Sequence, residues 1–242
     1  MVFSHLRWDL VFQRPQHLLI RFARFRRVYY MEEPVFVDQE LPYFTITRRQ
    51  DGFRIVLPHL STHTSHAERH KLLAKLVDQL IHQEKIKDQT IWYYTPEALP
   101  FTDHLAPVAV VYDCMDELSA FQGAPATLLK NEKRLLERAD VVFTGGDSLY
   151  EAKRSQHKNI HSFPSSIDVE HFGKSRSITE EAPDQAGIPH PRFGFTGVID
   201  ERMDIELLAA VADERPDWHL VMIGPVVKID PASLPQRSNI HY

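Results

Sequence analysis

The chain has 242 residues, of which 43% are hydrophobic and 25% are charged, and this composition is typical of a folded globular protein rather than a disordered one. Its net charge of -5 argues against a general nucleic-acid binder, and we expect no nucleic acid among its partners. No apolar run approaches the roughly 20 residues of a membrane-spanning helix, and the single cysteine, Cys114, excludes an internal disulfide. These features predict a cytoplasmic protein.

The first unusual segment is a polar stretch after the short apolar start, Met1 to Phe3. A strand and a helix can be joined by two to six residues, so a longer connection rich in hydrogen-bonding and aromatic groups suggests a binding loop. Those groups are Ser4, His5, Arg7, Trp8, Asp9, Gln13 and Arg14. Apolar residues at a helical spacing from Arg14 to Phe25, with Pro15 suited to the first turn, predict that a helix begins inside this stretch. Arginines far outnumber acids here, so this end of the chain is locally basic.

Strand and helix patterns then alternate along the chain. Strands are predicted at Arg27–Glu32, in a hairpin over Tyr43–Pro58 around Asp51 and Gly52, at "TIWYYTP", at "VAVVYDCMDE" and at Asp140–Gly146, and helices at Ala67–Glu84 and Leu128–Ala139. Such alternation predicts an α/β fold, with a parallel sheet of Rossmann-like type covered by helices on both faces.

A change of composition between Phe172 and Pro191 predicts a linker. We expect a domain over residues 1–172, a linker over 173–191 and part of a second Rossmann-like domain over 192–242. In that last part, strands at Arg192–Gly197 and Trp218–Val226 flank a helix at Asp204–Pro216. A unit of this length is shorter than the roughly 100 to 150 residues typical of a domain.

Ligands of open parallel sheets bind beyond the carboxyl ends of the strands, so the residues after each strand are the candidate site residues. They are rich in hydroxyl, carboxylate and small side chains, which suits a polyhydroxylated ligand that also carries phosphate. The set comprises Ser4, His5, Arg7, Trp8, Arg14, Tyr94, Thr95, Asp113, Asp116, Glu117, Gly145, Gly146, Asp147, Ser148, Ser165, Ser166, Asp168, Gly197, Arg202, Gly224 and Pro225. Neither a dinucleotide-binding G-x-G-x-x-G nor a P-loop follows the first strand, which argues against hydride transfer and P-loop phosphoryl transfer.

Several of these features also have purely structural explanations. Asp113 and Asp116 could act on a ligand, or Asp116 could cap a helical turn. The glycines of "GGDS" could let the backbone approach a ligand, while Asp147 or Ser148 caps the next helix. The spacing of His63, His66 and His70 could suit a metal, but a polar helix start explains it better, and we expect no metal and no cofactor. Cys114 is expected to be a buried thiol rather than a nucleophile.

The combined motifs resemble those of bacterial GT-B glycosyltransferases, of the family 4 or family 1-like type that includes teichuronic acid and other polysaccharide enzymes. The segments that carry the resemblance are "FSHLRWDLVFQRPQHLL", "VYYMEEPVF", "VVYDCMDELSAF", "ADVVFTGGDSLYEAK", "FPSSIDVEHF" and "FGFTGVIDERMDIELL". The resemblance implies two Rossmann-like domains with the active site between them. The first domain would receive the acceptor, and the second would hold the nucleotide diphosphate sugar.

On that pattern each candidate residue acquires an expected role. Asp113 is the leading catalytic candidate and Asp116 the second. The residues expected to bind the acceptor or sugar are Ser4, His5, Arg7, Trp8, Arg14, Tyr94, Glu117, Gly145, Asp147 and Ser148. Gly197 matches the glycine of the loop that meets the diphosphate, and Arg202 is the basic residue expected to neutralise it. Helix N-termini, rather than a metal, would supply further stabilisation. The basic first helix would suit a lipid-linked acceptor and a peripheral contact at the inner face of the membrane.

Two departures from the family pattern leave other functions open. Ser165 and Ser166 replace the usual Asn-Gly of the crossing segment, and Val198 stands where an arginine often follows the glycine. Family members also continue well past the "NIHY" strand into an acidic segment that grips the donor, so we expect impaired donor binding by these 242 residues alone. The alternatives are a noncatalytic acceptor-binding or scaffold protein and a GT-B-like nucleotide-sugar epimerase.

Overall fold

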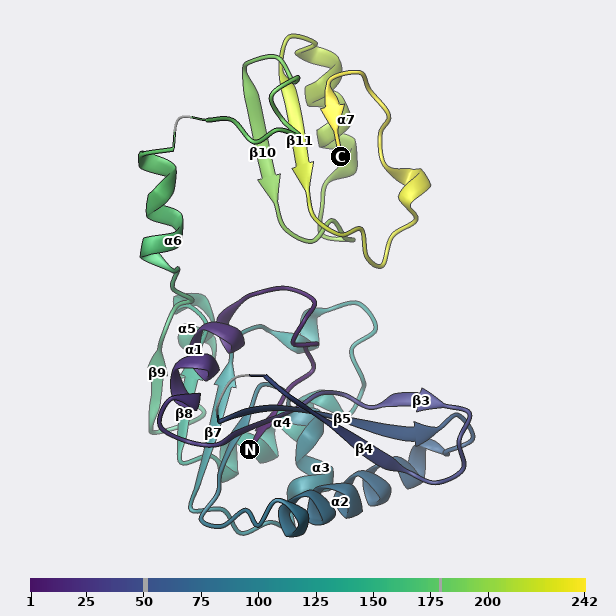
Figure 1. The fold of residues 1–242 in the computed structure, drawn as a ribbon, viewed down its shortest axis with the longest axis vertical. Coiled ribbons are helices and arrows are strands. Elements are labelled where there is room, and N and C mark those ends of the chain that lie inside the picture. The colour runs from purple at the N-terminus through teal and green to yellow at the C-terminus, as the bar shows by residue number, and fades with distance from the viewer. Residues whose placement is uncertain (50–51, 179) are drawn as a thin grey trace. The chain divides into compact units, whose positions relative to one another are not determined.

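The computed structural model describes residues 1–49, 52–178 and 180–242, which form two compact units, Met1–Val169 and Glu170–Tyr242. Figure 1 shows the elements of each unit. The division lies three residues before the boundary expected from composition, which was placed after residue 172. The extent of the linker over 173–191 stays a prediction.

Unit 1 is built on one sheet, which has nine strands in the part of the unit that the structure describes. The strand order is β3-β5-β2-β1-β6-β7-β8-β9, with β4 paired to β5. Every pairing is parallel except that of β4 with β5, which forms the predicted antiparallel hairpin. Asp51 of the predicted turn lies outside the described residues. The strands are β1 (Val2–Phe3), β2 (Val28–Met31), β3 (Val35–Val37), β4 (Tyr43–Arg48), β5 (Phe53–Ser61), β6 (Thr90–Tyr93), β7 (Ala109–Cys114), β8 (Val141–Thr144) and β9 (Ile160–Ser162).

Helices cover both faces of this sheet, as the alternation of elements predicted. They are α1 (Arg14–Ala23), α2 (His66–Gln83), α3 (Leu99–Thr102), α4 (Leu128–Arg138) and α5 (Asp147–Lys153), with 3-10 turns η1 (Pro96–Ala98) and η2 (Leu118–Ala120). Successive strand residues point to opposite faces. Val2 accordingly packs in one core with Leu19 of α1, and Phe3 packs in the other with Leu80 of α2 and Leu135 of α4. Each helix therefore needs only one apolar stripe to cover its face of the sheet.

The start of α1 is fixed by its own sequence. The Gln16 side chain accepts a hydrogen bond from the Gln13 backbone N–H at 3.1 Å, which satisfies a donor just before the helix. Pro15 stands in the first turn, where its missing N–H costs nothing. The helix therefore begins inside the polar stretch, as predicted, and the loop before it is tied to its first turn.

Unit 2 is a smaller parallel α/β unit. Its elements are α6 (Val169–Gly173), which begins at the last residue of unit 1, η3 (Lys174–Arg176), β10 (Arg192–Thr196), α7 (Ile205–Glu214), β11 (His219–Ile223), η4 (Pro231–Ser233) and β12 (Ile240–His241). The strands pair in the order β10-β11-β12. Ala212 of α7 packs with Leu220, Met222 and Ile240 of the sheet to form one core. This arrangement places the carboxyl ends of β10 and β11 next to each other, where the predicted diphosphate loop begins.

Candidate functional site

The polar loop after β1 is a rigid structure held by side chains. Ser4 is almost fully buried, and its hydroxyl oxygen accepts a hydrogen bond from the Leu6 N–H at 3.1 Å. The Tyr30 hydroxyl donates to the Leu6 carbonyl at 3.0 Å, and the Gln16 amide donates to the Trp8 carbonyl at 2.7 Å. These hydrogen bonds tie the loop to β2 and α1 at the carboxyl edge of the sheet, whereas the buried Nδ1 of His5 has no hydrogen-bond partner among the described residues.

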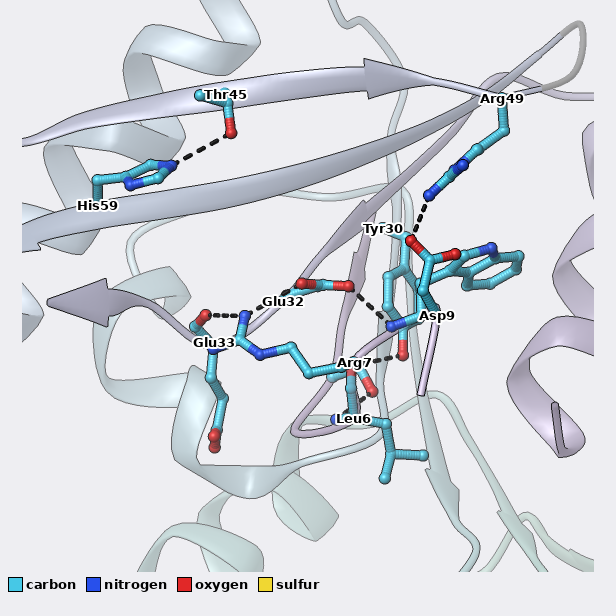
Figure 2. Close-up of polar contacts among 11 residues, drawn as sticks. Leu6, Arg7, Asp9, Tyr30, Glu32, Glu33, Thr45, Arg49 and His59 are labelled. Carbon is cyan, nitrogen blue, oxygen red and sulfur yellow. Dashed lines mark hydrogen bonds and ion pairs between the residues drawn. The ribbon is translucent and has the colours of Figure 1, made fainter. Parts of the chain in front are cut away.

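Glu32, at the end of β2, organises the tip of this loop. One of its oxygens accepts from Arg7 Nη1 at 3.0 Å and the other from the Trp8 N–H at 2.8 Å, while Arg7 also donates to the Glu33 carbonyl at 2.7 Å (Figure 2). The Trp8 ring lies 4.2 Å from that of Phe53, so it packs onto the sheet. Sequence reasoning missed Glu32 as a site residue, although its position as the last residue of a predicted strand was a usable signal.

Arg14 and Asp113 form a buried ion pair that joins the start of α1 to the end of β7. Arg14 Nε donates to both carboxylate oxygens, at 2.9 and 3.1 Å, and the Asp113 side chain is fully buried. Arg14 Nη1 also donates to the Phe163 carbonyl. Burial raises the pKa of Asp113, and the hydrogen bond and charge of Arg14 oppose that rise. The pair thus fixes the geometry of the edge, and direct contact of either residue with a ligand stays a prediction.

Tyr94, His5 and Asp116 lie around this pair at the ends of adjacent strands. Tyr94 is buried, and burial together with the charge of Asp113 raises the pKa of its hydroxyl well above the ordinary value. Burial lowers the pKa of His5, whereas the nearby Asp116 carboxylate acts in the opposite direction. Asp116 does not cap the next turn through its side chain, since that turn begins after Glu117 with no such bond. The partly exposed Asp116 is thus the more accessible of the two predicted catalytic carboxylates.

Glu117 is held by a buried lysine that the sequence did not single out. Lys153 of α5 lies 2.9 Å from a Glu117 oxygen and 2.9 Å from a Glu132 oxygen of α4. The Tyr112 hydroxyl donates to Glu132 at 2.7 Å. Nearby, burial raises the pKa of the Cys114 thiol to about 12, so it is protonated at neutral pH and the expectation of an unreactive thiol fits. Lys153 therefore links the segment that carries Asp116 and Glu117 to both α4 and α5.

The "GGDS" segment serves the packing of the edge more than the capping of α5. The helix begins after Gly146, and neither Asp147 nor Ser148 provides a side-chain cap, so that interpretation is wrong. Asp147 instead accepts a hydrogen bond from the Ser162 hydroxyl at 2.6 Å. A β-carbon on Gly145 would lie 2.5 Å from the Met115 carbonyl oxygen, so glycine is needed for the close approach of two loops. Contact of Gly145, Asp147 or Ser148 with a sugar stays a prediction.

In unit 2 the predicted diphosphate loop is positioned by backbone contacts. Gly197 follows β10, and its N–H donates to the Ile223 carbonyl at 3.0 Å. Gly224 follows β11 with φ +150°, and a β-carbon there would overlap the Gly197 carbonyl oxygen. Only glycine permits this approach, which makes the two loops continue side by side beyond the sheet.

Arg202 lies after the same loop and is already engaged by an acid. Its guanidinium donates to both oxygens of Asp200, at 2.7 to 3.1 Å, and this contact lowers the pKa of Asp200. The Arg202 side chain is nevertheless 60% exposed, so part of its guanidinium faces solvent. The N-terminus of α7 is capped by Asp204, which accepts from the Leu207 N–H at 2.9 Å, so one orphan donor of that helix is already satisfied.

The histidines of the "HTSHAERH" segment lie at the start of α2. His66 and His70 are in ring contact with centroids 6.3 Å apart. Among the residues that the structure describes, no group of three or more His, Cys, Asp or Glu side chains is placed to hold a metal ion.

The chain is similar in sequence to a known bacterial protein. No family model matches the chain. TuaH of Bacillus subtilis (strain 168), whose assignment as a teichuronic acid biosynthesis glycosyltransferase is itself provisional, is 26% identical over 174 residues. The match covers 65% of this chain and 43% of TuaH, so the chain spans less than half the length of this relative.

Comparison of structures gives a consistent fold. Sucrose-phosphate synthase from Thermosynechococcus elongatus superposes with a TM-score of 0.61 and 14% identity, over 98% of this chain and 63% of that one. A UDP-forming α,α-trehalose-phosphate synthase from Burkholderia xenovorans gives a TM-score of 0.57 and 14% identity, and the match covers 96% of this chain and 65% of that one. The catalytic domain of starch synthase IV from Arabidopsis thaliana, bound to ADP and acarbose, gives a TM-score of 0.56 and 8% identity. That match covers 96% of this chain and 69% of the other. The structural comparisons confirm the predicted fold, which this chain shares with GT-B glycosyltransferases.

Proposed function

We propose that the chain belongs to an enzyme that transfers a sugar from a nucleotide diphosphate sugar to a saccharide or lipid-linked acceptor in cell-surface polysaccharide synthesis. The observation that carries this proposal is the similarity to TuaH over 174 residues, which coincides with a fold shared with sugar-transferring synthases. Neither the scaffold nor the epimerase alternative gains support from these comparisons.

In this proposal unit 1 binds the acceptor at the carboxyl edge of its sheet. The rigid loop from Ser4 to Arg14 forms one wall of the site, and the segment that carries Asp116 and Glu117 forms another. The acceptor hydroxyl attacks the anomeric carbon as the bond to the diphosphate breaks, and Asp116 is the accessible carboxylate that would take the hydroxyl proton. Asp113, buried against Arg14, would position this edge rather than touch the substrate.

Unit 2 would bind the departing diphosphate. Negative charge grows on the phosphate oxygens as the glycosidic bond breaks, and fixed donors stabilise it best. The Gly197 and Ile199 amides already donate to backbone carbonyls, so the exposed part of the Arg202 guanidinium is the group suited to this role. Asp200 holds Arg202 in place through a two-point contact, which limits the entropy lost when a phosphate binds.

Calorimetric titration with UDP- and GDP-sugars tests this assignment. The titrations should use both this chain and a form extended through its natural reading frame. We expect Arg202→Gln to weaken binding by at least about tenfold in the form that binds the donor, because a hydrogen bond to a charged group contributes roughly 1.5–3 kcal/mol. Arg215→Gln is the matched control, since Arg215 makes a similar exposed two-point contact with Asp217.

Three results would contradict the proposal in different ways. Absence of nucleotide-sugar binding in both forms would contradict the transferase function. Equal weakening by both substitutions would show a nonspecific loss of charge. Binding unaffected by Arg202→Gln would show that the diphosphate lies elsewhere.

We also propose that the C-terminal end of α1 and the turn that follows it contact an anionic membrane surface. In the described residues no helix is both long and apolar enough to cross a membrane. However, Arg21, Arg24 and Arg26 are exposed close to Phe25, which is 82% exposed. Arginines beside an exposed aromatic ring suit the interface of a bilayer that contains acidic lipids.

Sedimentation with vesicles provides the test of this contact. We expect the chain to bind phosphatidylglycerol-containing vesicles and not neutral phosphatidylcholine vesicles. Because one basic residue contributes about 1 kcal/mol near such a surface, the double variant Arg24→Gln, Arg26→Gln should lose most of the binding. Equal binding of wild type and variant, or equal binding to both lipids, would refute the proposal.

A further inference from the structure

A cavity of 260 Å³ opens in unit 1 beside the rigid loop and shares only part of its wall with the residues discussed above. It lies where β1, β2 and β6 end and where α2 begins. The polar side chains that line it are Ser4, Glu32, Glu33, His66, Arg69, His70, Thr95 and Glu97. Phe36 and Phe101 supply apolar surface. The cavity therefore combines charges of both signs with aromatic rings.

Arg69, in the first turns of α2, is a cation with unused hydrogen-bonding capacity. Its guanidinium lies 4.5 Å from the centre of the Phe36 ring, and its Nε is buried with no hydrogen-bond partner. Among the described residues no carboxylate comes within ion-pair distance of it. A buried donor without a partner costs free energy, so an acceptor placed here by a ligand would bind with a net gain.

The acids of the cavity differ in how far they are already engaged. Glu32 is paired with Arg7 at 3.0 Å. Glu97 accepts from the Asn131 amide at 2.8 Å. Glu33, by contrast, makes no side-chain hydrogen bond or ion pair within the described part of the chain, and it does not pair with Arg69 across the cavity. Two opposite charges thus face one space without neutralising each other.

We propose that this cavity binds one anionic monosaccharide unit, with its carboxylate or phosphate on Arg69 and a sugar hydroxyl on Glu33. The guanidinium fork matches both kinds of anion, and Phe36 fixes its orientation. His66 and His70 line the same end of the cavity as Arg69 and add hydrogen-bond donors. The statement that this sugar is part of the acceptor rests on the proposed function. The statement that the cavity binds the sugar does not.

The size of the cavity limits the ligand to a single unit. Ligand pockets commonly begin at about 300 Å³, and this cavity is slightly smaller. A carboxylate- or phosphate-bearing hexose fills such a space, while the rest of a longer acceptor would extend outward past its mouth.

The test compares four probes on the wild-type chain without any donor present. The probes are glucuronate, glucose 6-phosphate, glucose and inorganic phosphate, titrated in a phosphate-free buffer and followed by calorimetry or protein-detected NMR. We expect at least one of the two anionic sugars to bind at least tenfold more tightly than glucose and than inorganic phosphate. Which anionic sugar binds more tightly distinguishes a carboxylate from a phosphate ligand.

Substitutions then locate the site. Arg69→Gln should remove the preference for the anionic sugar, with a loss of at least tenfold in affinity. Lys75→Gln, which removes an exposed positive charge from the same helix, should bind like the wild type. Circular dichroism and thermal unfolding confirm that each variant is folded. If Arg69→Gln does not fold, the wild-type preference for anionic sugar remains a sufficient test.

Each contrary result overturns the proposal. Glucose binding as tightly as the anionic sugars would show that no anion is recognised, and inorganic phosphate binding equally well would show that no sugar is recognised. If none of the four probes binds, or if Arg69→Gln binds the anionic sugar as tightly as the wild type does, the cavity is not a site for an anionic sugar. Anionic sugar binding combined with failure of all nucleotide-sugar titrations would retain this site and refute the transferase instead.

Discussion

The carboxyl edges of the two sheets are ordered by different means. In unit 1 the edge is fixed by side chains: Glu32 holds the β1 loop, Arg14 joins α1 to Asp113, and Lys153 ties down Glu117. In unit 2 the corresponding loops are fixed by the backbone, since Gly197 and Gly224 let them approach closely. Polar networks fix one edge through charged and hydroxyl side chains, whereas the glycines fix the other by letting two backbone segments meet. The difference fits the acceptor recognition proposed for unit 1 and the diphosphate recognition proposed for unit 2.

The strongest test of the side-chain network is Asp113→Asn. It leaves the buried Arg14 guanidinium without its counter-charge, and loss of one partner of a buried pair costs about 3–5 kcal/mol in the free energy of unfolding. Denaturant unfolding of the chain should show this loss. The matched control is Asp9→Asn, which removes the exposed partner of Arg49 and should change stability by less than about 1 kcal/mol.

A double variant sharpens this result. Replacing both members of the pair, with Arg14→Met and Asp113→Leu, removes the uncompensated charge and should recover much of the lost stability. Similar losses in Asp113→Asn and Asp9→Asn would contradict the structural role assigned to the buried pair.

The backbone order of unit 2 is tested by Gly224→Ala, for which we expect a somewhat smaller loss. The added methyl group overlaps the Gly197 carbonyl, and φ +150° is unfavourable for alanine, so unit 2 should lose roughly 2–4 kcal/mol. Hydrogen exchange followed by mass spectrometry should show faster exchange in residues 192–242 and unchanged exchange in the sheet of unit 1.

Gly194→Ala is the control for that experiment. Gly194 lies in β10, and a β-carbon there meets nothing within 4 Å. Its exchange should match the wild type, and equal acceleration in both variants would show that the approach of the two loops is not what orders unit 2.

Much of the fold could be predicted from local pattern. Helical spacing between Arg14 and Phe25 and between Ala67 and Glu84 located α1 and α2 to within a few residues, because the apolar stripe of a surface helix must face its core. Pro15 marked the first turn of α1, because its missing N–H costs nothing there. Strand β3 was missed because Val35–Val37 is too short to show alternation.

The candidate site was predicted in position more than in detail. The rule that ligands bind beyond strand ends selected Asp113, Tyr94 and Gly145 correctly as neighbours, since parallel strands end at one edge. The partners of these residues could not be predicted, because Arg14 and Asp113 are 99 positions apart in the chain. The expected helix cap at Asp147 or Ser148 was wrong, because both residues lie inside α5 and Gly146 occupies the cap position before it.

By itself the sequence determined the alternation of elements, the polar loop and the glycines after the strands, because these depend on spacing and on intrinsic backbone preference. Only the tertiary structure decided which charges neutralise each other. Asp113 forms an ion pair with Arg14, and Glu117 forms one with Lys153. Arg69 has no counter-charge among the described residues and lies beside an open cavity. Ion pairing depends on distance and burial in space, and these are set by the packing of segments remote in sequence.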